Sequence, residues 1–189
     1  MNLVRCDAVE PQPWRNGGGL TRELLAWPAR DDWALRLSVA DIRADGPFSA
    51  FPGVDRWFAV IEGHGVLLGL PEGWRSVEIE DAPLPFRGEA APQCELLDGP
   101  TRDLNLMIRR DAGRAAMQRA QAGEDFTTRA RFRALFTADA LMLQIDGSDA
   151  LRLPAFALAW DASTAHGRWR VAAETPVRAL WIHFEPRPA

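Results

Sequence analysis

The sequence contains no lysine and no tyrosine, so all 22 of its basic residues are arginine. Without lysine, catalysis through a Schiff base is excluded, because that intermediate forms on a lysine amine. Without tyrosine, no phenol can act as a general acid or base. Reactions that depend on either side chain are therefore excluded at the outset.

Cysteine is also scarce. Cys6 and Cys94 lie far apart and outside any CxxC pattern, which is typical of free thiols in a cytosolic protein. The N-terminal segment lacks a basic region followed by an apolar one, and no apolar run approaches the length that spans a membrane. We therefore expect a cytoplasmic protein without a membrane partner.

Positive charge is not concentrated in any segment. The formal net charge is -4 and the pI is about 5.4, whereas a nucleic-acid partner requires a basic stripe or patch. We therefore expect no nucleic-acid partner. The 189 residues suffice for one large all-β domain or for two small ones that share a core.

Histidine occurs only at three widely separated positions, His64, His166 and His183. No HxH pair occurs on a predicted strand, whereas the ligands of a metal site usually come in pairs at local spacing. A three-histidine site would need all three side chains to converge from a turn, a loop and a terminal strand. We predict no metal and no other cofactor.

No catalytic nucleophile stands out in the sequence. Ser38 and Ser49 lack the context of a nucleophile elbow, and Cys94 has no histidine close to it in the chain. The carboxylates between residues 78 and 81 surround a short predicted strand, where charged side chains are normally solvated. We assign structural roles to these residues and predict no catalytic residue.

Two apolar runs, residues 57–61 and 66–70, give the clearest structural signal. Gly63 and Gly65 lie in the break between them, so we predict a β-hairpin whose glycines adopt positive φ. Because both faces of both runs are largely apolar, the hairpin should lie inside a sandwich or barrel. Residues 33–40 alternate strictly, which predicts another strand with one face toward the core.

The second half of the chain repeats the pattern of the first. Residues 133–147 place two apolar runs around a small break, as residues 57–73 do. The repeat predicts an all-β fold of two small jelly-roll barrels. We place one barrel at residues 1–110, with its first strands able to join the other barrel, and the second at residues 126–189. Residues 111–125 lack apolar periodicity and are predicted to be a linker or a short helix.

Three segments carry a family resemblance: PWRNGGGLTREL, the stretch from Trp33 to Leu70, and TRDLNLMIRR. Together they resemble the signature segments of the HutD/Ves family of bacterial proteins. The resemblance implies a bicupin, which has two RmlC-like cupin barrels in one chain, from a family encoded with histidine-utilisation genes in some bacteria. It implies no particular enzymatic activity, because a fold alone does not define a function.

Polar residues within apolar strands are the best candidates for a binding site. Arg36 and Ser38 share one strand face, Asn105 interrupts an apolar strand, and Arg56 directly precedes an apolar run. If these side chains point into a barrel, they predict a site for a small carboxylate, because a buried guanidinium needs an anionic partner. The alternative is that Arg36 faces solvent or forms an ion pair with one of three acidic residues: Asp41, Asp55 or Asp103.

The segment from Asn16 to Gly19 gives further candidates. It lacks the GK[ST] ending of a phosphate-binding loop, so we interpret it as a tight loop whose backbone passes close to another segment. Direct ligand contact is the alternative, since Asn16 can donate and accept hydrogen bonds at a pocket rim. The family resemblance favours that alternative, because Asn16, Gly18 and Thr21 match its most characteristic positions. We therefore add Asn16 and Thr21 to the ligand-binding candidates.

Three hypotheses about function remain. The first is a non-enzymatic bicupin that binds a small anionic metabolite and modulates histidine utilisation; the pathway, which the resemblance supplies, suggests urocanate or a formimino-glutamate-like carboxylate. The second is a metal-free isomerase or hydrolase that uses a carboxylate and His64 or His183. The third is an assembly protein with filled barrels, which predicts no pocket of ligand size. We favour the first.

The chain contains eight tryptophans, several of them next to arginine, as in Trp74-Arg75 and Trp169-Arg170. Tryptophan is favoured at interfaces because it combines a large apolar ring with one polar group. The sequence therefore predicts a tryptophan-containing homodimer face. The alternative is that tryptophan replaces the missing tyrosine at the ends of the barrels.

Overall fold

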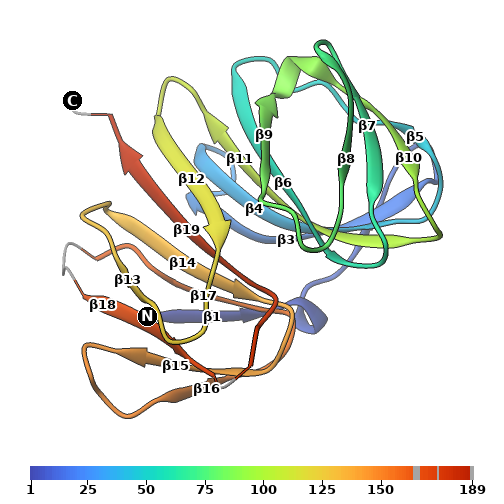
Figure 1. The fold of residues 1–189 in the computed structure, drawn as a ribbon. Coiled ribbons are helices and arrows are strands. Elements are labelled where there is room, and N and C mark those ends of the chain that lie inside the picture. Colours follow the sequence, from blue (N-terminus) through green and yellow to red (C-terminus); the bar gives the residue numbers. More distant parts are fainter. Residues whose placement is uncertain (164–166, 174, 188–189) are drawn as a thin grey trace. The chain divides into compact units, whose positions relative to one another are not determined.

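The computed structural model describes residues 1–163, 167–173 and 175–187, and it consists of β-strands and two single 3₁₀ turns (Figure 1). The prediction of an all-β protein is confirmed. The chain forms two compact units, which we call the first unit (residues 9–113) and the second unit (residues 1–8 and 114–189). Among the described residues, no helical segment has the length and hydrophobicity that crossing a bilayer requires.

The first unit contains a six-stranded and a four-stranded sheet. The larger sheet has the order β2 (Gln12–Pro13), β3 (Gly19–Pro28), β4 (Trp33–Ile42), β11 (Thr101–Arg109), β6 (Val54–Glu62) and β9 (Leu84–Arg87). The smaller sheet has the order β5 (Gly46–Pro47), β10 (Gln93–Leu96), β7 (Val66–Leu70) and β8 (Gly73–Val77). The 3₁₀ turn η2 (Gly88–Ala90) follows β9.

The second unit contains a five-stranded and a four-stranded sheet. The larger sheet has the order β1 (Asn2–Arg5), β17 (Ala157–Asp161), β14 (Phe132–Thr137), β19 (Ala179–Pro186) and β12 (Gly113–Arg119). The smaller sheet has the order β13 (Asp125–Thr127), β18 (Arg168–Ala172), β15 (Leu141–Ile145) and β16 (Leu151–Leu153). The 3₁₀ turn η1 (Cys6–Ala8) follows β1.

The same strand order recurs in the two units. The run β4-β11-β6-β9 has its counterpart in β12-β19-β14-β17, and β5-β10-β7-β8 has its counterpart in β13-β18-β15-β16. This recurrence agrees with the repeat in the sequence. The predicted closed barrels are not formed by the described residues, because the edge strands hydrogen-bond only within their own sheets, whereas closure requires a ladder that joins the sheet edges.

The predicted hairpin is wrong, although both of its strands exist. β6 pairs with β11 and β9 in the six-stranded sheet, whereas β7 pairs with β10 and β8 in the four-stranded sheet. With both edges of β6 already paired, the turn carries the chain from one sheet to the other. The predicted positive φ values are confirmed at Gly63 (94°) and Gly65 (134°).

The strand predicted at residues 33–40 is confirmed as part of β4, but the prediction that only one of its faces is core is wrong, because residues 37–42 are buried on both faces. Ala40 and Ile42 of β4 belong to the hydrophobic core of the first unit. Arg36 and Ser38 lie on the same face of β4 as these two residues, because side chains two positions apart on a strand point the same way. The other face carries Leu35, which is fully buried as well. The interior face of the six-stranded sheet is therefore apolar toward one end and polar toward the other.

The predicted linker or helix at residues 111–125 is wrong over most of its length. This stretch contains β12, an edge strand beside β19, and ends where β13 begins. Only Gly113 and Met117 of β12 are buried. An edge strand with one exposed face can use small and polar residues, and for that reason the stretch shows no apolar periodicity.

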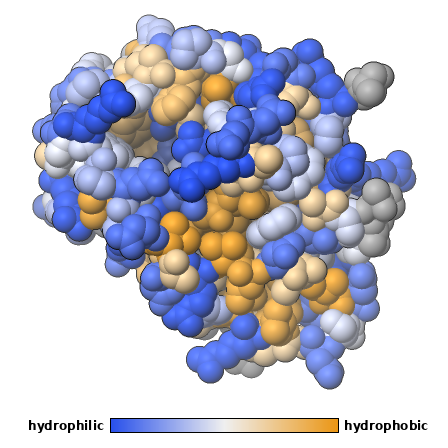
Figure 2. Space-filling model, turned by 180° about the vertical axis from the view of Figure 1, so that it is seen from behind, coloured by the Kyte–Doolittle hydropathy of each residue, from blue (hydrophilic) through white to orange (hydrophobic). Residues whose placement is uncertain are grey.

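Large exposed hydrophobic side chains are few in the described residues and include Trp74, which is 52% exposed. Figure 2 shows one face of the molecule, where a group of hydrophobic residues is surrounded by hydrophilic ones. Trp169 is 1% exposed and belongs to the core of the second unit, so it cannot contribute to a dimer face as predicted. The homodimer and the cytoplasmic location stay predictions.

Candidate functional site

The first unit contains a pocket of about 660 Å³ at the polar end of the six-stranded sheet. Its floor consists of interior side chains of β3, β4, β6 and β11, and the segments before β3 and around β5 complete its walls. All six residues predicted to bind a ligand line this pocket: Asn16, Thr21, Arg36, Ser38, Arg56 and Asn105. Residues from four separate segments of the chain are thus brought together.

The strand register explains why the polar residues meet. Met107 of β11 lies between Arg36 of β4 and Arg56 of β6, so these three side chains form one row across the sheet. In the next row, Asn105 lies directly opposite Ser38. Because residues two apart on a strand share a face, both rows point into the same pocket.

Arg56 is the central charged group of the site. Its side chain is 6% exposed, and its Nη2 donates a hydrogen bond of 2.7 Å to Oδ1 of Asn105. Nε and Nη1 are buried and have no hydrogen-bond acceptor. Among the described residues, no carboxylate forms an ion pair with Arg56. Burial lowers the pKa of Arg56 to about 10, so the guanidinium remains charged at neutral pH.

Three aromatic rings surround the Arg56 guanidinium. Its central carbon lies 5.0 Å from the ring centroid of Phe48, 5.1 Å from that of Phe86 and 5.6 Å from that of Phe51. The faces of aromatic rings attract cations but accept only weak hydrogen bonds. The rings therefore hold the charge in place and do not satisfy the N–H groups of Nε and Nη1.

Arg36, unlike Arg56, has a carboxylate partner among the described residues. Its Nη2 lies 2.8 Å from Oε2 of Glu23, and its guanidinium lies over the ring of Trp33 at 5.3 Å. Its Nε is buried and has no acceptor. The predicted alternative partners Asp41, Asp55 and Asp103 are wrong, because Glu23 on the neighbouring strand β3 is the partner. Arg36 still lines the pocket.

The neutral candidates occupy the floor and rim of the pocket. Ser38 is 8% exposed and lies on the floor beside Asn105. At the rim, Thr21 accepts a hydrogen bond of 2.7 Å from the indole Nε1 of Trp14, and Asn16 Oδ1 accepts one of 3.1 Å from the Gly18 backbone. These bonds fix Trp14 and the glycine-rich turn at the pocket mouth.

Gly19 supports the tight-loop interpretation of the glycine-rich segment. A Cβ atom at this position would lie 2.5 Å from the carbonyl oxygen of Asp41 and 3.2 Å from the ring of Trp14. Any other residue would force these groups apart. The interpretation of a backbone that passes close to another segment is confirmed at Gly19.

The charge of the pocket wall has one sign. Three arginines line the pocket, Arg15, Arg36 and Arg56, and none of the described lining residues carries a carboxylate, an imidazole or a thiol. A concave site with this lining attracts anions. It offers no ordinary general base, because the usual side chains for that role are absent from its wall.

His64 and His183 lie outside this pocket. His64 is exposed near a turn, with Nε2 3.8 Å from Asp98 Oδ2, and His183 belongs to β19 of the second unit, where burial lowers its pKa. His166 lies outside the described residues. Within the part of the chain that is described, no three His, Cys, Asp or Glu side chains gather closely enough to hold a metal ion.

Sequence reasoning missed the aromatic walls and the partner of Arg36. Trp14, Phe48 and Phe51 all line the pocket, but they occur in segments rich in proline and glycine, where no strand periodicity indicates the direction of a side chain. Three aromatic residues within such segments are the signal that was available. Glu23 gave no comparable signal, because its approach to Arg36 depends on a register shift in the pairing of β3 with β4.

The fold and the pocket define a class of protein: a cupin-like all-β protein with an arginine-lined pocket. A cupin 2 conserved barrel domain protein from Leptotrichia buccalis superposes with a TM-score of 0.57 at 12% identity, covering 97% of this chain and 96% of that one. This likeness shows the fold alone.

The chain belongs to the HutD family, whose model matches residues 7–180. HutD from Pseudomonas fluorescens, in a structure described as a formate condition, is 27% identical, with a TM-score of 0.86 and 99% coverage of both chains. A conserved protein of unknown function from Pseudomonas aeruginosa is 28% identical, with a TM-score of 0.87, covering 97% of this chain and 98% of that one.

Two curated relatives match a shorter stretch. A 21.2 kDa protein in the hutC 3' region of Pseudomonas putida is 38% identical over 122 residues, which are 62% of this chain and 63% of the relative. Protein Ves from Citrobacter koseri is 38% identical over 117 residues, 61% of this chain and 60% of the relative. The chain thus spans about three-fifths of the length of these relatives.

Proposed function

We propose that this chain is a bicupin that binds a small carboxylate metabolite in the pocket of the first unit and modulates histidine utilisation without catalysis. The observation that carries the proposal is the Arg56 guanidinium, buried and charged, with two nitrogens that lack an acceptor. A buried charge without a partner is costly, so it is retained where a ligand supplies the partner. The recurring strand order of the two units supports the bicupin part.

The family supports the pathway part of the proposal. One curated relative is encoded in a hutC 3' region, and a solved relative is named HutD. Carboxylates of histidine degradation, such as urocanate or a formimino-glutamate-like compound, fit the positive lining of the pocket. Formate, which is named with the Pseudomonas fluorescens structure, is the smallest carboxylate and the simplest probe.

The alternatives have less support. A metal-free isomerase or hydrolase needs a general base at the substrate, and the described pocket lining offers no carboxylate or imidazole. An assembly protein with filled barrels predicts no cavity of ligand size, whereas this pocket measures about 660 Å³. Binding without turnover is therefore the function that we propose.

Isothermal titration calorimetry tests the proposal with formate, acetate and urocanate. We expect saturable binding of the carboxylates and none of acetamide, which has the size of acetate but no charge. At constant ionic strength, we expect a heat of binding for the charged carboxylates and none for the uncharged amide. Formation of a product from any of these compounds would overturn the proposal, and so would equal binding of acetate and acetamide.

Asn105→Asp supplies a direct competitor for the ligand. The new carboxylate would lie where Asn105 Oδ1 now accepts the 2.7 Å hydrogen bond from Arg56, so it would neutralise the guanidinium from within. We expect formate to bind at least about tenfold more weakly, since each 1.4 kcal/mol changes affinity tenfold. Gln118→Glu serves as a control that adds the same charge at an exposed position of β12, outside the pocket lining. Unchanged affinity in Asn105→Asp would place the ligand elsewhere.

A further inference from the structure

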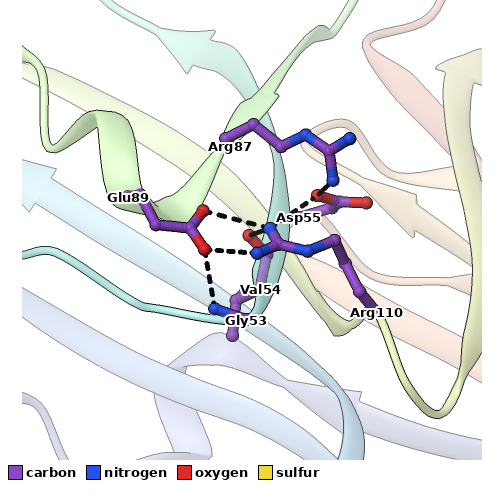
Figure 3. A network of polar contacts seen from close by, with 6 residues as sticks. All are labelled: Gly53, Val54, Asp55, Arg87, Glu89 and Arg110. Carbon is purple, nitrogen blue, oxygen red and sulfur yellow. Dashed lines mark hydrogen bonds and ion pairs between the residues drawn. The ribbon is translucent and has the colours of Figure 1, made fainter.

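A network of polar contacts outside the pocket joins Glu89 to Arg110 (Figure 3). Arg110 Nη1 donates to Glu89 Oε2 at 3.0 Å, and Arg110 Nη2 also donates to Oε1 of the same carboxylate. The backbone N–H of Gly53 donates to Glu89 Oε1 at 2.8 Å. Arg110 Nη1 also donates to the carbonyl oxygen of Val54 at 3.0 Å. The ion pair between Glu89 and Arg110 therefore connects three segments of the chain: the start of β6, the turn η2 and the residue after β11.

These three segments are the ends of the strands beside Arg56. Glu89 lies in η2, directly after β9, Arg110 follows β11, and Val54 begins β6. Arg56 is the third residue of β6, and in the register it lies opposite Phe86 of β9 and Met107 of β11. The ion pair thus fixes the strand ends next to the row that carries the guanidinium.

The aromatic wall of the pocket depends on the same turn. The N–H of Phe51 donates to the Gly88 carbonyl at 2.9 Å. The contact is so close that a Cβ atom at Gly88 would lie 2.4 Å from the carbonyl oxygen of Phe51. The ring of Phe51 covers the Arg56 guanidinium at 5.6 Å. The position of this ring is therefore set by η2, which Glu89 and Arg110 hold in place.

We propose that Glu89 and Arg110 are positioning residues that hold Phe51 over Arg56 and so fix the orientation of the carboxylate site. This inference rests on the proposed function. Both side chains are partly exposed, 43% for Glu89 and 31% for Arg110, and exposed ion pairs add little to global stability. The hydrogen bond from Arg110 lowers the pKa of Glu89 to about 2, so the pair persists across the pH range of ordinary assays.

The test uses Glu89→Ala, Arg110→Gln and the double variant, with Arg87→Gln as the matched control. Arg87 also forms an ion pair at this strand end, with Asp55 Oδ1 at 2.9 Å, an oxygen to which Arg110 Nη1 also donates at 3.2 Å. Among the described residues, no hydrogen bond joins Arg87 to Gly53 or to Glu89. Two quantities are measured: hydrogen exchange of the Phe51 amide without ligand, and the dissociation constant of sodium formate against sodium chloride at equal ionic strength. The Phe51 amide is informative because neither Glu89 nor Arg110 accepts its hydrogen bond.

We expect exchange at Phe51 to accelerate at least about tenfold in Glu89→Ala and in Arg110→Gln, and formate to bind about three to tenfold more weakly. The double variant should show the same Phe51 exchange rate and the same formate affinity as either single variant, because the two residues act as a unit. The melting temperature should change little in all of them, and Arg87→Gln should resemble the wild type.

Unchanged exchange at Phe51 in the single variants would overturn the inference, and an equal effect of Arg87→Gln would do the same. Failure of the wild type to bind formate would instead count against the proposed function. In that case the Phe51 exchange still decides whether Glu89 and Arg110 hold the aromatic wall. A gain in exchange without any loss of formate affinity would show that the wall does not orient the site and would also overturn the inference.

Discussion

Replacing Arg56 with methionine is expected to abolish carboxylate binding and, at the same time, to raise the melting temperature of the ligand-free protein. Removing one member of a buried charge pair typically costs about 2–5 kcal/mol of binding free energy, or about 30-fold to several thousandfold in affinity. Formate should therefore no longer bind measurably. The loss follows from the position of Arg56, whose Nε and Nη1 are buried without a protein acceptor.

The gain in stability has the same origin. Desolvation lowers the pKa of Arg56, as expected for a guanidinium whose burial is unfavourable without an ionic partner. Methionine has a similar length and no charge, and buried ionic groups are often replaced by apolar ones with neutral or stabilising effect. We expect a gain of about 1 kcal/mol, which corresponds to about 2–4 °C for a chain of this size.

Arg36→Met is the matched control for this prediction. Arg36 lines the same pocket but already has Glu23 as an ionic partner, so its removal takes away the closer of the two arginines that pair with Glu23, the other being Arg30 at 3.3 Å. This variant should lose stability and bind formate only moderately more weakly. Calorimetric titration and thermal unfolding, both without and with formate, measure the two effects. If Arg56→Met bound formate as the wild type does, the pocket would not be the carboxylate site.

The residues of the site could be predicted from the sequence because strand alternation determines which side chains share a face. Arg36 and Ser38 are two residues apart on β4, and the structure brings Asn105 opposite Ser38. That Arg36 and Ser38 share a face follows from the alternation of one strand and needs no information about the whole fold. That Asn105 of β11 faces the same pocket was a hypothesis, since the pairing of β11 with β4 joins residues that are far apart in the chain, such as Asn105 and Ser38.

The hairpin was mispredicted because local sequence does not specify the partner of a strand. A glycine-rich break between two apolar runs fits a hairpin and also fits a turn between two facing sheets. The deciding factor was that β6 pairs on both sides with distant strands, β9 and β11. The aromatic walls were missed for another reason. Phe48 and Phe51 lie close to Arg56 in the chain, but the contact of their rings with its guanidinium depends on how the connection between β5 and β6 folds, and that connection has no strand periodicity.

Replacing Asp103 with asparagine is expected to stabilise the protein at neutral and alkaline pH and to remove part of its pH dependence. Asp103 is completely buried in the first unit, where Thr101 Oγ1 donates a hydrogen bond of 2.8 Å to its Oδ2, while Oδ1 has no partner. Burial raises the pKa of Asp103 well above its usual range, and the nearby charge of Asp41 raises it further. The folded protein therefore favours the protonated carboxyl group.

The sign of the pH effect follows from this raised pKa. Below the ordinary aspartate pKa of about 4, both folded and unfolded chains carry the proton, and Asp103 imposes no ionisation cost. As the pH rises above that value, only the unfolded chain releases the proton, so the free energy of unfolding falls by about 1.4 kcal/mol per pH unit. The fall ends when the pH exceeds the raised pKa in the folded protein.

Asparagine has nearly the same shape as the protonated carboxyl group and cannot ionise. At pH 8 the variant should therefore exceed the wild type in unfolding free energy, because only the wild type bears the ionisation cost of Asp103. Carboxyl groups such as Asp41, whose pKa is lowered by hydrogen bonds from Arg102 and Arg22 against the opposing effect of burial, act in the opposite direction. These carboxyl groups contribute less to the free energy of unfolding as the pH falls, in the wild type and in Asp103→Asn alike.

Urea denaturation of the wild type and of Asp103→Asn at a series of pH values measures the effect of Asp103, because the contributions of groups that do not interact with Asp103 cancel in the difference. We expect the difference in unfolding free energy to be smallest near pH 4 and to grow toward pH 8. Asp98→Asn is a suitable control, since Asp98 is exposed and its replacement should leave the curve unchanged. A difference that stays constant with pH would mean that Asp103 ionises as readily in the folded protein as in the unfolded chain, which is incompatible with a carboxyl group buried in this core.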